Sequence, residues 1–329
     1  MDTKILIKDV VNRLPWIDWA KAICMFCVIL THTHCFRGVR ILNYFDIPAF
    51  MMISGFLYKR VPIKQELKKS FRGIVIPYLL FNVFLLIISL FFYSFQWMGI
   101  IDILTGNQEG LRWICFYPMW FLVSILVIRI ISSLCKEEWY LWMMFGFFVI
   151  GFFVGKIAPY EYDYFQLCTT IMCYPFFLMG TILKKYNAFE FPNKIKPIIR
   201  YLLILSILCV LVYLMRFNGF ANIFRCISGN NTLYYFICIS FSYLILYIFS
   251  KLFTKESTMI LTISSGTVLI LGLHRMFLLG IIHTLPKNNF TAITVAILVM
   301  IICYPLIVLA KKYFPALLGG RGVSNQKSD

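Results

Sequence analysis

Residues 16–36 read WIDWAKAICMFCVILTHTHCF, and this stretch decides the fold. It is apolar enough to enter a lipid bilayer, yet it contains Asp18, Lys21, His32 and His34. Inserting an ionisable side chain at membrane depth carries a substantial free-energy cost, so such residues are functional candidates by default. The stretch therefore predicts a membrane span that lines a polar site.

The composition of the whole chain fits a membrane protein. Of its 329 residues, 61% are hydrophobic and 14% are charged, whereas soluble domains are about half apolar and a quarter charged. The net charge of +17 could indicate a nucleic-acid partner. We exclude that class because the basic residues form short clusters between apolar runs, as in polytopic proteins of an inner membrane. The eleven cysteines show no metal-ligand spacing, so we expect no metal site.

The apolar runs predict an all-α bundle of about ten transmembrane helices, since each span needs roughly 20 residues. We expect no separate soluble domain. The predicted spans are residues 15–36, 41–58, 74–95, 114–134, 139–155, 164–183, 200–217, 231–250, 261–283 and 291–310.

The distribution of Lys and Arg predicts the orientation of the spans. With the N-terminus inside, the cytoplasmic segments hold 21 of the 31 basic residues and the outside loops hold seven. Because cytoplasmic loops carry the basic excess, both termini are expected to be cytoplasmic. We expect a cytoplasmic segment at 1–14, a transmembrane domain at 15–310 and a cytoplasmic tail at 311–329, in a multi-pass protein of the plasma (inner) membrane.

Helical geometry sorts the four ionisable residues of the first span. Lys21 and His32 differ by eleven positions, which is about 20° around a helix. Asp18 falls within about 60° of Lys21, whereas His34 falls about 140° away. We therefore expect Asp18, Lys21 and His32 to line one cavity that His34 does not share.

A purely structural interpretation of the same span stays open. Met25 and Val28 fill the stripe between Lys21 and His32. Asp18 could pair with Lys21 near the cytoplasmic interface while the lysine snorkels, and His32 could lie among the outer headgroups.

Six motifs in order carry a resemblance to a known family. The first three are IDWAKAICMFCVILTH at 17–32, FDIPAFMMISGFL at 45–57 and RGIVIPYLLFN at 72–82. The later ones are YPMWFLVSILV at 117–127, YPFFLMGTILKKY at 174–186 and SSGTVLILGLHRMFL at 264–278. From about residue 16 to 310 the chain resembles the acyltransferase 3 family of membrane O-acyltransferases. Two positions depart from the family pattern: Lys21 stands where Arg is more frequent, and Asp46 stands where relatives often have His.

The resemblance implies transfer of an acyl group, usually acetyl, from a coenzyme A thioester to a hydroxyl of a cell-surface polysaccharide or its lipid-linked precursor. Acetyl-CoA is thus the expected co-substrate. A neutral imidazole suits the removal of the hydroxyl proton, so His32 is the expected general base. A covalent acyl-histidine is the alternative. Lys21 and Asp18 complete the expected catalytic set, with Asp18 orienting the lysine.

Three further residues are expected to bind substrate or donor. Lys21 lies about 16 Å from His32 along the helix, which is similar to the reach of a pantetheine arm. We expect the donor phosphates near Lys21 and the basic stretch 59–73, with Arg72 in contact. Binding of anionic lipid headgroups would also explain that basic stretch. Trp120 either packs or stacks on a sugar or adenine, and His274 either contacts substrate or bonds between helices.

Two other classes of function compete with an enzyme. A carrier of a small solute or acyl group could use Asp18, Lys21 and His32 as a polar relay, although the chain shows no inverted repeat. A structural accessory protein would leave the buried charges unexplained. The expected partners are acyl-CoA, a glycan acceptor and membrane lipids, with no nucleic acid.

Overall fold

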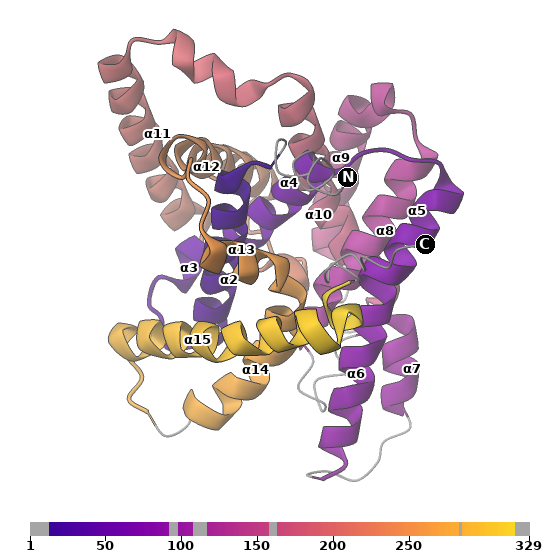
Figure 1. Ribbon diagram of the computed structural model, residues 1–329. Coiled ribbons are helices and arrows are strands. Elements are labelled where there is room, and N and C mark those ends of the chain that lie inside the picture. The colour runs from indigo at the N-terminus through magenta and orange to yellow at the C-terminus, as the bar shows by residue number, and fades with distance from the viewer. Residues whose placement is uncertain (1–12, 92–97, 108–116, 158–162, 283–284, 320–329) are drawn as a thin grey trace, which may run out of the picture.

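The computed structural model describes residues 13–91, 98–107, 117–157, 163–282 and 285–319. Parts of the predicted terminal segments, 1–12 and 320–329, lie outside these residues. The described chain is helical without β-strands, which confirms the all-α prediction (Figure 1). The helices are α2 (Pro15–His32), α3 (Val39–Leu42), α4 (Asp46–Leu57), α5 (Ile63–Ser70), α6 (Ile76–Ser89), α7 (Met98–Thr105), α8 (Trp120–Leu134), α9 (Tyr140–Ile157), α10 (Leu167–Lys185), α11 (Pro197–Asn218), α12 (Asn231–Leu252), α13 (Thr258–Ser265), α14 (Thr267–Ile282) and α15 (Asn289–Tyr313).

Each of the ten predicted spans contains helix, but the number of membrane crossings is a separate matter. Among the described residues six helices are long and apolar enough to cross a bilayer, and a bent pair raises this to seven. A membrane protein is confirmed, whereas the count of ten and the side of the termini stay predictions. The six are Ile63–Ile88, Glu137–Val154, Tyr164–Lys185, Pro197–Asn218, Asn231–Leu252 and Asn289–Tyr313.

The bent pair replaces the continuous helix that was predicted at 261–283. α13 and α14 meet at Gly266 with a bend of 78°. A Cβ at Gly266 would overlap the Ile307 side chain of α15, so the absence of a side chain permits this close approach. Hydropathy cannot report such a break, because both halves of the span are equally apolar.

The core of the bundle centres on α4. Eight of its twelve residues are buried, and at a rise of 1.5 Å per residue it is about 18 Å long, shorter than a bilayer core of about 30 Å. It packs most extensively against α10. A Cβ on Gly55 would overlap the carbonyl oxygen of Phe177, and a Cβ on Gly180 would overlap that of Met52. These two glycines therefore bring the backbones of α4 and α10 into direct contact.

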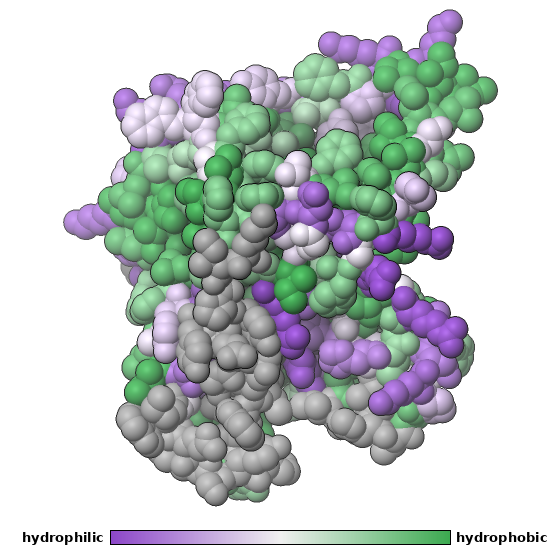
Figure 2. Space-filling model, turned by 180° about the vertical axis from the view of Figure 1, so that it is seen from behind, coloured by the Kyte–Doolittle hydropathy of each residue, from purple (hydrophilic) through white to green (hydrophobic). Residues whose placement is uncertain are grey.

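The outer helices expose apolar side chains as membrane helices do. α11 buries only Leu211 and Met215 of its 22 residues, and Ile198 and Phe217 are 72% and 76% exposed. In water this surface would be unfavourable, whereas lipid covers it without cost. Figure 2 shows apolar side chains over much of one face, with hydrophilic side chains gathered in a hollow near its middle.

The short helix η1 (Phe71–Val75) joins α5 to α6 and has π-helical hydrogen bonding. π-helical turns inside longer helices are frequent at functional sites. Arg72 lies in this turn with an exposed side chain, and its neighbour Gly73 packs against the backbone at Gly319. The sequence predicted a site at Arg72 but not the local change in helix geometry.

Candidate active site

His32 is the last residue of α2, and its ring is held by the preceding helical turn. Its Nδ1 lies 2.7 Å from the carbonyl oxygen of Val28. A carbonyl only accepts hydrogen bonds, so Nδ1 carries the proton and donates it. In the neutral imidazole the lone pair then resides on Nε2. This tautomer is the one a general base needs.

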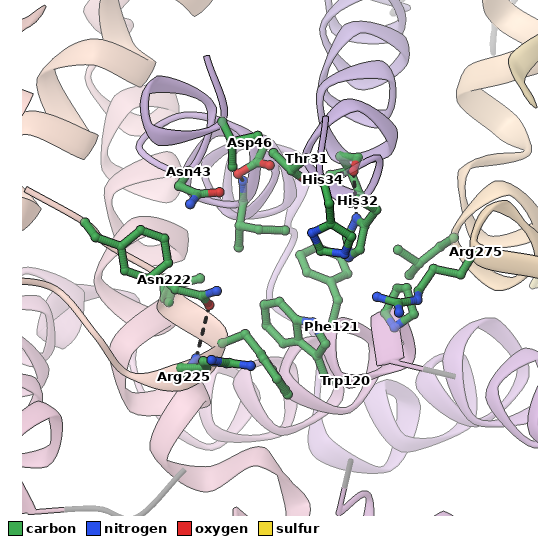
Figure 3. A pocket seen from close by; sticks show the side chains of 18 residues that line it. Thr31, His32, His34, Asn43, Asp46, Trp120, Phe121, Asn222, Arg225 and Arg275 are labelled. Atoms are coloured by element: carbon green, nitrogen blue, oxygen red, sulfur yellow. Dashed lines mark hydrogen bonds between the residues drawn. The ribbon is translucent and has the colours of Figure 1, made fainter. Parts of the chain in front are cut away.

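His32 lines a cavity of about 560 Å³, which we name the His32 cavity. Its walls come from the end of α2, the start of α4, the start of α8, the loop between α11 and α12, and α14 (Figure 3). The size suits a small substrate group, since ligand pockets range from about 300 to 1,000 Å³. The polar and aromatic lining residues are Thr31, His32, His34, Asn43, Asp46, Trp120, Phe121, Phe220, Asn222, Phe224, Arg225 and Arg275.

The prediction that His34 would not share this cavity is wrong. α2 ends at His32, and His34 has a φ of 55°. The helical rotation of 100° per residue therefore stops before His34, and the left-handed turn places its side chain at the cavity. Figure 3 shows the two imidazoles side by side.

His274 lies beside His32 and is fully buried. The two ring centroids are 5.0 Å apart with the rings at 71°. Nδ1 of His274 lies 2.9 Å from the carbonyl oxygen of Ile270, which repeats the bond that His32 makes to its own helix. Its Nε2 has no hydrogen-bond partner among the described residues. An unpartnered buried nitrogen is costly, which makes His274 Nε2 a candidate contact for a bound group.

The loop between α11 and α12 forms a wall that the sequence did not reveal. Asn222 and Arg225 both line the cavity, and the Asn222 side chain accepts a hydrogen bond from the Arg225 backbone at 3.2 Å. The loop is tied to the α3–α4 region, because the Asn43 side chain donates to the Ala221 carbonyl at 3.0 Å. Its sequence, NGFANIFRCISGNN, signals turns but gives no indication of where the loop packs.

Asp46, to which the sequence gave no role, also lies in the wall. Its side chain is 4% exposed, and its Oδ1 accepts the backbone N–H of Ile47 at 2.7 Å. Trp120 lies across the cavity and is 5% exposed. Its ring packs against Phe224 at 5.5 Å, which confirms the packing alternative, and stacking on a sugar or adenine stays a prediction.

Asp18 lies far from this cavity. It is 14 residues from His32, about 21 Å along α2, and lines a small crevice with Arg13 and Glu256. Its carboxylate accepts a hydrogen bond from Arg13 Nε at 2.8 Å and another from Ser264 Oγ. The bond to Asp18 raises the pKa of Arg13. The structure thus ties Asp18 to the N-terminal segment and α13, and the expectation that it lines the same cavity as His32 is wrong.

Open space lies along the second half of the predicted stripe on α2. A narrow extension of about 40 Å³ is lined by Met25 and Val28, and it shares Val28, Ile47 and Phe121 with the His32 cavity. Lys21 follows on the same stripe one turn beyond Met25, outside the lining of either space. The expectation that Lys21 lines the same cavity as His32 is therefore wrong too.

Arg72 is separate from the cavity too, since neither space includes it in its lining. Within the described residues its side chain makes no hydrogen bond or ion pair. In the same part of the chain no group of three or more His, Cys, Asp and Glu residues is arranged to hold a metal ion.

Comparison with known proteins gives one result. Residues 14–311 match the family model of acyltransferase 3, described as an acyltransferase domain. No curated protein and no solved structure matches the chain. The match spans nearly the whole chain, so the protein belongs to this family of membrane acyltransferases, which generally act on surface glycans.

Proposed function

We propose that this membrane acyltransferase moves an acetyl group from acetyl-CoA to a hydroxyl of a cell-surface polysaccharide or its lipid-linked precursor, with His32 as the general base. One observation carries the assignment of His32. Its Nδ1–H is committed to the Val28 carbonyl, which leaves the Nε2 lone pair for the cavity.

The transfer can be written with all atoms accounted for. Nε2 of His32 takes the proton of the acceptor hydroxyl while the hydroxyl oxygen attacks the thioester carbonyl. The carbon–sulfur bond then breaks, and the imidazolium returns its proton to the leaving thiolate. The products are the ester and free coenzyme A. A route through acyl-histidine would start from the same Nε2 lone pair.

The stripe on α2 supports a route for the donor. The narrow extension runs from the His32 cavity past Val28 and Met25, in the direction of Lys21. A pantetheine arm placed there would bring the thioester to His32 and the phosphates toward the opposite end of α2. Lys21 and Arg72 are the cations that we assign to those phosphates.

The opposite walls of the His32 cavity suit a sugar. Trp120 and Phe121 offer aromatic faces, and Asn43 and Asn222 offer amide groups. Pockets of this kind combine aromatic surface with a few oriented polar groups. We assign these walls to the acceptor and place His274, behind His32, as a second polar contact of the site.

The test compares two histidines of the same cavity. Membranes containing the full chain are incubated with acetyl-labelled acetyl-CoA, and the label is measured in the glycan and lipid-linked glycan fractions. We expect His32→Ala to lower incorporation by about 10²- to 10⁴-fold, the usual contribution of general base catalysis. His34→Ala is the matched control and should stay within about tenfold of the wild type.

Three outcomes of this test bear on the proposal. Near-normal acetylation by His32→Ala would remove His32 from its role. An equal loss in both variants would point to damage of the cavity rather than to base catalysis. Labelled acetyl groups or solute that cross the membrane without entering any acceptor would favour a carrier.

A further inference from the structure

A second cavity of about 500 Å³ lies at the other end of α4, and we name it the Lys184 cavity. Three segments line it: residues 58–60 after α4, residues 137–142 around the start of α9, and residues 181–186 at the end of α10. It shares no lining residue with the His32 cavity or with the narrow extension.

The charge of the Lys184 cavity favours an anion. Four cations line it, against the two carboxylates of residues 137 and 138. Within the described residues none of these cations forms an ion pair, and Lys185 has its ammonium 5.7 Å from the centroid of the Tyr186 ring. The four cations are Lys59, Arg60, Lys184 and Lys185.

The surroundings of the cavity are those of a membrane surface. Leu141 and Trp142 of α9 line it and are 45% and 75% exposed. α9 continues from there as a candidate span whose window is only 11% buried, so its outer face meets lipid. Exposed Trp beside clustered Lys and Arg is typical of the interface between the headgroups and the acyl chains.

We propose that the Lys184 cavity binds the phosphate headgroup of an anionic membrane phospholipid, with the acyl chains lying along α9. The cations would hold the phosphate, and Trp142 would lie at the depth where headgroup meets acyl chain. This proposal is independent of the function proposed above. The direct backbone contact of α4 and α10 at Gly55 and Gly180 lies between the two cavities, which argues against assigning this site to the acyl donor.

The chain contains its own matched control for a test. α10 ends in Lys184–Lys185 and is followed by Tyr186, and α15 ends in Lys311–Lys312–Tyr313. In both, the second lysine lies over the tyrosine ring, at 5.7 Å and 4.9 Å. The two lysine pairs differ in that residues 184 and 185 line the cavity.

The experiment measures lipid binding to the detergent-purified full chain by native mass spectrometry. Phosphatidylglycerol and phosphatidylcholine are titrated against the wild type and two double variants. We expect Lys184→Gln/Lys185→Gln to weaken phosphatidylglycerol binding about tenfold or more, from the attraction typical of each lysine near a membrane surface. Lys311→Gln/Lys312→Gln should stay within about threefold, and Lys184→Arg/Lys185→Arg should bind like the wild type.

Each other outcome overturns the proposal. Equal losses in the two glutamine variants would mean that any basic helix end attracts the lipid. If phosphatidylcholine bound as tightly as phosphatidylglycerol, the net charge of the headgroup would play no role. Displacement of the lipid by adenosine 3′,5′-bisphosphate or inorganic phosphate at micromolar concentration would assign the cavity to a soluble phosphate ligand instead.

Discussion

The His32 cavity and the Lys184 cavity share one helix and are built on different principles. At the first end of α4, two imidazoles donate to carbonyl groups of their own helices, and an asparagine-rich loop closes the wall. At the other end, four cations that form no ion pair among the described residues line open space. Proton transfer needs a fixed tautomer and direction, whereas attraction of a phosphate needs only accumulated charge. The two ends of α4 are thus suited to the two different tasks proposed for them.

The largest effect is expected at the contact between α4 and α10, because both cavities depend on it. Gly180→Ala places a methyl group against the Met52 carbonyl, and we expect a loss of about 3 kcal/mol in unfolding free energy. Both acyl transfer and phosphatidylglycerol binding should fall with it. Gly146→Ala on α9, where a Cβ meets nothing within 4 Å, is the control and should not destabilise the protein. Unfolding in detergent measures both, and equal stability of the two variants would contradict the close contact.

A smaller effect is expected at the buried ion pair between α5 and α8, where the Arg129 carbonyl accepts a hydrogen bond from Tyr58 of the Lys184 cavity. Glu66 is fully buried and accepts hydrogen bonds from Arg129 at 2.7 Å and Ser70 at 2.9 Å. Glu66→Ala leaves the Arg129 charge unpaired, and because that side chain is 26% exposed we expect a loss of about 2 kcal/mol.

The control for Glu66 is an ion pair at the surface. Glu190 lies 3.5 Å from Lys251 and its side chain is 70% exposed, so Glu190→Ala should change unfolding free energy by no more than about 0.5 kcal/mol. The same detergent unfolding assay applies. If Glu66→Ala cost no more than the control, the buried pair would not hold α5 against α8.

The smallest expected effect concerns the donor route, which can be tested separately from the acceptor walls of the His32 cavity. Val28→Phe fills the narrow extension, and we expect the KM for acetyl-CoA to rise about tenfold, as a pocket obstructed by a few carbon atoms typically shows. Val39 lines the His32 cavity but not the extension, so Val39→Phe should leave that KM near the wild-type value. Initial rates at varied acetyl-CoA measure both, and reversed effects would place the donor elsewhere.

Part of the fold and of the candidate site could be predicted from the sequence. Each of the ten stretches predicted from hydropathy contains helix, and the 100° rotation correctly aligned Met25, Val28 and His32 on open space. The same rotation failed at His34 because the helix ends two residues earlier. Asn222 and Arg225 lie some 190 positions from His32, and no periodicity connects residues across such a separation. The break at Gly266 depends on a side chain of another helix, which hydropathy does not register.

The direct backbone contact between α4 and α10 has a mechanical consequence. Carbonyl oxygens seated against glycine Cα atoms leave no compressible layer of side chains, and close-packed interiors transmit displacement rather than absorb it. Sliding one helix along the other would drive these oxygens into the next side chain, so we expect the pair to shift as one body. Movement at the His32 cavity would then be transmitted to the Lys184 cavity, although the two share no lining residue.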